Sequence, residues 1–186
     1  MSREHPIPPH GGYEQLRSYQ AAQRIYDATV IFCDRFVDKR SRTHDQMVQA
    51  ARSGVRNIAE GSMASATSKK TEIKLTGVAR ASLEELLLDF KDFLRHRQLP
   101  IWEKESPQAR AVRGRCRSIP SDSPSDPYGV SAAVPAVAAN TMICMINQAT
   151  YLLRLQLESL EQRFLEDGGF TERLYRIRHD RRAKDQ

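Results

Sequence analysis

Four long stretches of the chain carry apolar residues at alternating three- and four-residue steps, which is the period of an amphipathic α-helix. They cover about residues 13–37, 43–61, 69–96 and 136–167. In the third stretch, acidic and basic side chains fall on the side of the helical wheel opposite the apolar stripe. No alternation typical of strands and no internal repeat is present, so the sequence predicts an all-α protein.

Capping residues mark the expected ends of the second helix. Thr43, with Gln46 three residues later, has the spacing of a capping box at its start. Gly61 is expected to end it, because glycine readily adopts the left-handed conformation that follows a helix. The small polar residues 62–68 then form a loop before the third helix.

Short links between the first three helices, and a long link before the fourth, predict an antiparallel up-down four-helix bundle over residues 13–169. Residues 97–131 are rich in Arg, Ser, Pro and Asp. They predict a long irregular excursion between helices three and four, with room for a short helix near 106–113. Residues 1–12 are expected to form a flexible N-terminal arm, and residues 170–186 a basic C-terminal tail.

Small residues are concentrated in the second helix, at Ala50, Ala51, Gly54 and Ala59. A glycine inside a helix costs about 1 kcal/mol relative to alanine. Gly54 therefore indicates a contact with a neighbouring helix that leaves no room for a side chain.

Composition adds an excess of positive charge to this picture. The chain has 186 residues, a formal net charge of +6 and a sequence pI of about 9.4. The length suits one domain with a proper core. The charge favours an anionic partner such as nucleic acid or an acidic protein surface, although a basic balance also simply keeps proteins dissolved.

The cysteines and the N-terminus bear on the cellular compartment. Cys33, Cys116 and Cys144 show neither disulfide nor metal-binding spacing, which favours a reducing compartment. The first 15 residues lack the apolar core of a secretory signal. No stretch approaches the ~20 apolar residues that span a bilayer. We therefore expect a cytoplasmic protein with no membrane partner.

Residue patterns for catalysis are absent from the sequence. The five histidines are scattered, with no HExxH-like pair and none three residues after a glutamate, as di-iron bundles require. The segment SATSKKTE at 65–72 lacks the glycines of a phosphate-binding loop. We expect no catalytic residue, no metal, no cofactor and no enzymatic activity.

Cationic residues one helical turn apart are the main functional signal. Arg52 and Arg56 form one such pair, and Lys70 and Lys74 another. These pairs suit successive phosphates of a nucleic-acid backbone, which need cationic donors. The alternative is a solvated face paired with acidic neighbours. The complete candidate set is Arg52, Arg56, Lys69, Lys70, Lys74, Arg80, Arg173, Arg176, Arg181 and Arg182.

Asn57 and Glu60 are polar residues near the end of an apolar helix. We favour structural roles for both, with ligand binding as the alternative. Asn57 is expected to bond a neighbouring helix or loop, because buried polar groups are normally hydrogen-bonded. Glu60 is expected to accept amides from the following turn or from the start of the third helix.

A composite motif lies in the second and third helices. The string Asn-Ile-Ala-Glu-Gly at 57–61 is followed at a fixed distance by Ala-x-x-Ser-Leu-x-Glu at 79–85. With these residues the chain resembles the bacterial four-helix-bundle family named for the protein encoded within the intervening sequence of large-subunit ribosomal RNA genes. That family includes the accessory protein of diversity-generating retroelements, and the chain is similar to its branch called the four helix bundle suffix domain. The motif positions are Gly54, Asn57, Glu60, Gly61 and Ser82.

The resemblance, over about residues 13–96 and more loosely 136–165, implies an up-down bundle with a basic surface that assembles into a ring, usually a pentamer. In the retroelement members the implied role is binding nucleic acid and a reverse transcriptase. Surplus apolar width on helices one and three agrees with contacts between subunits. We therefore predict a non-enzymatic homo-oligomeric bundle that binds structured RNA or DNA. The alternative is a protein-interaction scaffold whose basic face docks an acidic protein partner.

Overall fold

The computed structural model describes residues 11–118 and 126–184, and every regular element within those ranges is helical. The prediction of an all-α protein is therefore confirmed. In this described part, no helix has an apolar stretch long enough to cross a membrane. The elements in chain order are a short 3-10 turn η1 (Tyr13–Gln15), α1 (Arg17–Phe36), α2 (Arg42–Ala64), α3 (Lys69–His96), α4 (Pro107–Ser118), α5 (Pro135–Asp167) and α6 (Phe170–Lys184).

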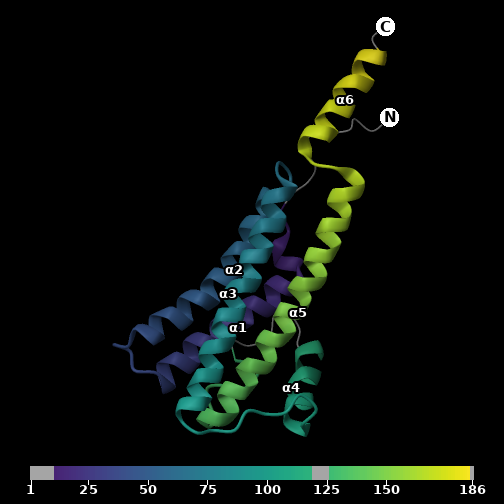
Figure 1. Cartoon of the computed structure of the whole chain (residues 1–186). Coiled ribbons are helices and arrows are strands. Elements are labelled where there is room, and N and C mark those ends of the chain that lie inside the picture. Colours follow the sequence, from purple (N-terminus) through teal and green to yellow (C-terminus); the bar gives the residue numbers. More distant parts are fainter. Residues whose placement is uncertain (1–10, 119–125, 185–186) are drawn as a thin grey trace.

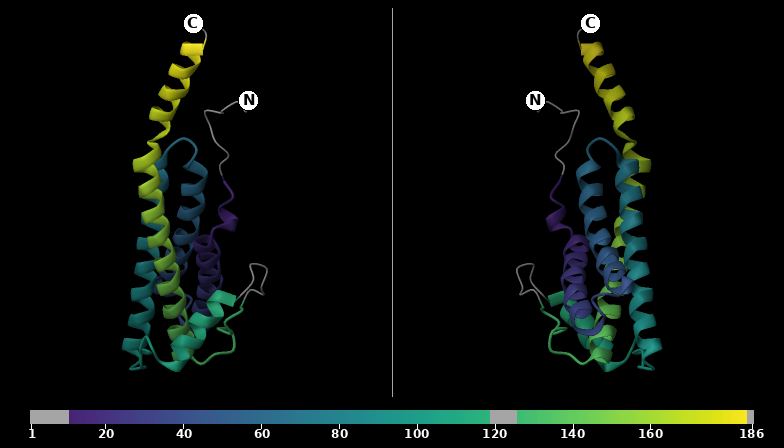
Figure 2. Two further views of the ribbon diagram at one scale, coloured as in Figure 1. Left: turned by 90° about the vertical axis from the view of Figure 1, so that its right-hand side faces the viewer. Right: turned by 90° about the vertical axis from the view of Figure 1, so that its left-hand side faces the viewer.

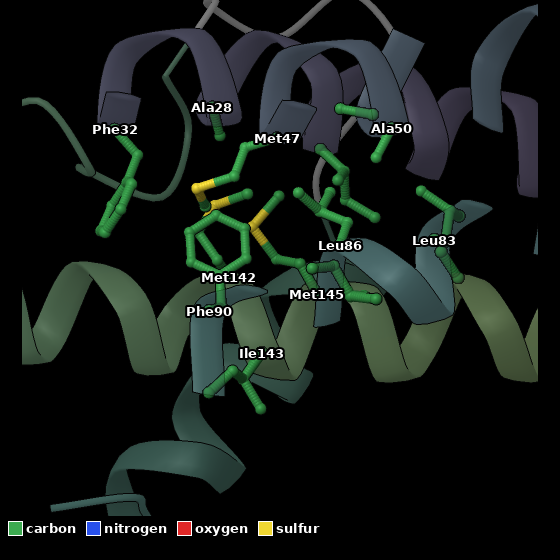
Figure 3. Packing of buried hydrophobic residues seen from close by; sticks show 14 of the residues in the cluster. Ala28, Phe32, Met47, Ala50, Leu83, Leu86, Phe90, Met142, Ile143 and Met145 are labelled. Atoms are coloured by element: carbon green, nitrogen blue, oxygen red, sulfur yellow. The ribbon is translucent and has the colours of Figure 1, made fainter. Parts of the chain in front are cut away.

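The helices α1, α2, α3 and α5 lie side by side (Figures 1 and 2). α2 packs against α1 and α3, α5 packs against the same two helices, and α4 lies against α5. Their apolar stripes meet in one core, where Figure 3 shows Phe32 of α1, Met47 of α2, Phe90 of α3 and Met142 of α5. These four side chains are almost completely removed from water. α6 extends past the end of α5 and away from the other helices (Figure 1).

The contact between α2 and α3 is made close by glycine. A Cβ added at Gly54 would lie 2.8 Å from Cδ2 of Leu83, a side chain with no exposed surface. The inferred contact without room for a side chain is therefore confirmed at Gly54.

Gly61 lies inside α2 and not at its end, because the helix continues to Ala64. The predicted helix end is wrong, and the reason is packing against α3. A Cβ at Gly61 would lie 3.3 Å from both the carbonyl oxygen of Glu72 and the Cβ of Leu75. The glycine thus permits a second close approach of the two helices.

The start of α2 also differs from the prediction. Ser41, rather than Thr43, is the N-cap, and its Oγ accepts a hydrogen bond from the backbone N–H of Thr43 at 3.1 Å. At the start of α3, Ser68 Oγ accepts from the backbone N–H of Thr71 at 3.2 Å. Such side-chain acceptors satisfy amides that the first helical turn leaves unpaired.

Residues 97–131 are not irregular throughout, because α4 forms within them and is longer than the short helix expected there. The segments before and after α4 are bonded to α5 and α1 by a buried side chain and a charged one. Asn140 of α5 donates to the carbonyl oxygens of Pro100 and Ala136, and its Oδ1 accepts from the backbone N–H of Trp102 at 2.7 Å. On the other side, Arg35 of α1 donates to the Val130 carbonyl. These bonds fasten the connection to α1 and α5.

The structure describes most of the C-terminal tail but only the last two residues of the expected N-terminal arm. Residues 1–10 of the expected N-terminal arm lie outside the described residues, and Gly11 and Gly12 are exposed. The basic tail is helical from Phe170 to Lys184, as α6.

Replacing Gly54 by alanine should destabilise the protein relative to the same change at Gly77. Alanine gains helix propensity of about 1 kcal/mol at either site. A methyl group at 77 would meet no atom within 4 Å, whereas one at 54 would displace Leu83. We expect Gly54→Ala to have a free energy of unfolding roughly 1–3 kcal/mol below that of Gly77→Ala in urea titrations. Equal values would contradict the close α2–α3 contact.

Replacing Asn140 by leucine should lower the free energy of unfolding by about 2 kcal/mol, because leucine makes none of the three hydrogen bonds that the buried Asn140 side chain forms with the backbone. Asn147→Leu is the matched control, since Asn147 donates to the Ile143 carbonyl of its own helix. Trp102, the single tryptophan, should move into water and shift its fluorescence to longer wavelength only in Asn140→Leu. Identical behaviour of the two variants would show that Asn140 does not hold the connection.

Candidate nucleic-acid interface

Arg52 and Arg56 lie one turn apart on the exposed face of α2, opposite its buried stripe. Together with Gln49, Asn57 and Glu60 they line a shallow depression of the surface. Within the described residues, no carboxylate lies within 4 Å of either guanidinium group. Both charges are therefore available to an anion from solvent.

Arg56 is also close to α1. Burial is the main cause that raises the pKa of Tyr19 above its usual value, and the positive charge of Arg56 acts in the opposite direction. The positive charge of Arg56 therefore acts on a residue of α1, the helix packed against α2.

Asn57 and Glu60 do not have the predicted partners. Asn57 Nδ2 donates to the carbonyl oxygen of Ser53 at 2.8 Å, within its own helix and not across to a neighbour. Glu60 is exposed, because α2 continues beyond it. The amides of the following turn bond to backbone carbonyls, such as Ser68 N–H to Ala64. Glu60 therefore adds a negative charge to the depression that contains Arg52 and Arg56.

Lys70 and Lys74 are exposed on α3, the helix packed against α2. In the part of the chain that the structure describes, neither has an ion-pair partner. Arg80 and Lys69 differ from them. Arg80 pairs with Glu84 at 2.9 Å, and Lys69 pairs at 2.9 Å with Glu72, which is 9% exposed. Arg80 and Lys69 are therefore paired with acidic neighbours, as the alternative to phosphate binding predicted.

The remaining candidate cations lie on α6. Arg173 donates to the Ala66 carbonyl at 3.3 Å, and Arg176 to the Asp167 carbonyl at 2.7 Å. Arg182 is exposed, and the side chain of Arg181 lies outside the described residues. Arg173 and Arg176 line a pocket with Lys69. The structure therefore joins two of the predicted clusters, the start of α3 and the basic tail.

Arg163 of α5 lines the same pocket and was missed by the sequence analysis. The sequence gives little indication that Arg163 belongs to a site. Arg163 lies little more than one turn before Gly168, where α5 stops, so its side chain reaches the bend between α5 and α6. Nothing in the helical period shows that the first turns of α6 lie beside the residues before α3.

The other motif positions, Gly54, Gly61 and Ser82, lie between α2 and α3. The two glycines are buried in the contact itself. Ser82 is half-buried and lines a groove between the helices with Arg42, Asp45, Gln46, Gln49, Ala50, Ser53 and Glu85. These positions shape the surface near Arg52 without adding positive charge of their own.

Reactive groups inside the helices are few. Burial raises the pKa of the Cys33 thiol to about 12, and it also raises the pKa values of Cys116 and Cys144. All three thiols are therefore mainly protonated near neutral pH, and the thiolate is the nucleophilic form. Among the residues described, no three His, Cys, Asp or Glu side chains are grouped so that they could hold a metal ion.

Comparison of the chain with protein-family models, with curated proteins and with solved structures finds no match. The resemblance of residues 13–96, and more loosely of 136–165, to the four-helix-bundle family therefore stays a prediction.

Proposed function

We propose that the chain is a non-enzymatic, antiparallel up-down four-helix bundle of α1, α2, α3 and α5 that binds structured RNA or DNA through its backbone phosphates. The observation that carries the proposal is the set of unpaired cations on α2 and α3. Arg52, Arg56, Lys70 and Lys74 are exposed on two adjacent helices and have no acidic partner in the described part of the chain.

The pattern of ion pairing favours phosphate binding at Arg52, Arg56, Lys70 and Lys74 rather than a basic surface without a binding role. Two other exposed arginines, by contrast, form ion pairs within their own helices: Arg95 with Asp92 and Arg154 with Glu158. A cation already paired with a carboxylate gains little from a phosphate, because the carboxylate has to be displaced. The unpaired cations instead release condensed counterions when they bind a phosphate.

We propose further that the bundle forms homo-oligomers, as the resemblance to pentameric rings implies. Large apolar side chains are exposed on α3 and α5, among them Leu88 at 60% and Tyr151 at 52%. Leu88 and Tyr151 therefore lie on the outer sides of two helices that pack against each other. The mass of the nuclease-treated protein in solution tests this proposal: an oligomer has a multiple of 21.2 kDa, and a mass of 21.2 kDa at working concentration contradicts it.

Binding should depend strongly on salt and on the two α2 arginines. The wild-type slope of log affinity against log salt should be steep. Arg52→Gln/Arg56→Gln should reduce this slope by about 2, because each arginine that no longer neutralises a phosphate lowers it by roughly 1. Fluorescence anisotropy with a labelled structured RNA measures both slopes.

The control is Arg95→Gln/Arg154→Gln, which removes the same net charge from arginines that are ion-paired. It should leave the slope nearly unchanged. A flat wild-type slope, or equal reductions in the two double variants, would contradict the proposal. Retention of an acidic protein partner after nuclease treatment, with no affinity for RNA or DNA, would support the scaffold alternative instead.

A further inference from the structure

The bend between α5 and α6 encloses a concave pocket lined by four cationic side chains. Lys69 comes from the start of α3, Arg163 from the end of α5, and Arg173 and Arg176 from α6. The cavity has a volume of about 410 Å³. Its cations come from three helices, so the pocket depends on the bend at Gly168, which places the first turns of α6 beside the residues before α3.

The turn itself requires glycine. Gly168 has φ 70° and ψ −172°, a backbone conformation that other residues rarely adopt. After it, the backbone N–H of Gly169 donates to Oε2 of Glu172 at 3.0 Å. That carboxylate occupies the N-terminal end of α6, so an anion in the pocket would be held by the side chains and not by the amides of this helix.

The three arginines are fixed in place without losing their charge to a carboxylate. Each donates one N–H to a backbone carbonyl: Arg163 to Ser159, Arg173 to Ala66 and Arg176 to Asp167. Among the described residues, no carboxylate lies within 4 Å of their guanidinium nitrogens. A guanidinium has five N–H donors, so each keeps donors for a ligand.

Acidic residues limit how much negative charge the pocket can take. Asp167 and Asp180 also line it, and Lys69 is paired with Glu72. Three arginines against two aspartates leave a small positive balance. That balance suits one phosphate group, which matches the planar donor fork of arginine, better than a long polyanion.

We propose that this pocket binds a single phosphate group, carried by a small phosphorylated compound or by the end of a nucleic-acid strand. Arg163, Arg173 and Arg176 supply the donors. The site is separate from the cations of α2, and the proposal does not depend on nucleic-acid binding there.

Titration of the full chain with inorganic phosphate, followed by calorimetry or by the phosphorus NMR signal, tests the site. Wild-type protein should bind phosphate saturably at constant ionic strength, with chloride as the competing anion. Arg163→Gln should weaken binding by about tenfold. This variant is preferred because the hydrogen bond of Arg163 stays within α5, whereas Arg173 also holds α6 to the 65–66 turn.

Arg178→Gln is the matched control, because Arg178 is exposed on α6 and does not line the pocket. It should bind phosphate as wild type does, and circular dichroism should show unchanged helicity in both variants. The proposal is overturned if wild-type protein shows no saturable binding, if Arg163→Gln binds as tightly as wild type, or if Arg178→Gln loses as much affinity as Arg163→Gln.

Two further measurements identify the source of the phosphate and separate this site from the α2 surface. A 5′-phosphorylated oligonucleotide that displaces inorganic phosphate, where its 5′-hydroxyl counterpart does not, identifies a strand end. Failure of both to displace it identifies a small phosphorylated compound. Arg52→Gln/Arg56→Gln should retain phosphate binding in full, so loss of the nucleic-acid surface and loss of the pocket are distinguishable.

Discussion

The close approach of α2 to α3 at Gly54 and Gly61 is the constraint on which the surface of this protein depends. Each glycine faces an atom of α3 at a distance that a methyl group could not share without displacement. The two helix backbones therefore lie close together, and the faces of α2 and α3 opposite this contact are turned outward. Arg52 and Arg56 lie two residues before and after Gly54, on the outward face of α2, and the depression that they line is formed by α2 alone. Lys70 and Lys74 lie two residues before and after Glu72, on the outward face of α3.

Local ion pairing then decides which cations remain available to a partner. Arg80 and Arg154 are four residues before a glutamate on an exposed helix face, and both pair with it. Arg56 has the same spacing to Glu60, but the two form no ion pair. Lys70 and Lys74 have no such pair in the described part of the chain. At the bend before α6 the arginines are anchored on backbone carbonyls instead. The net charge of +6 is therefore distributed unevenly, with unpaired charge on α2, on α3 and at the bend.

The helical period predicted the spans of α3 and α5 well, because long amphipathic patterns are strong signals. It failed at Gly61, since a glycine that ends a helix and one that permits close packing look the same in a sequence. It also gave no sign of the Asn140 bonds to Pro100 and Trp102, which join residues far apart in the chain. In the candidate site the pair Arg52 and Arg56 was predictable from spacing. Arg163 was not, because its role depends on where α6 turns.

Lysine acetylation of the full chain, with and without a structured RNA at low salt, tests the central claim most directly. The account places backbone phosphates against Lys70 and Lys74, and it leaves Lys39 and Lys104 in solvent, although all four side chains are exposed in the free protein. Mass spectrometry should therefore show that RNA reduces the reactivity of Lys70 and Lys74 and leaves that of Lys39 and Lys104 unchanged. Equal reactivity of all four lysines with and without RNA, or protection confined to Lys39 and Lys104, would contradict the account.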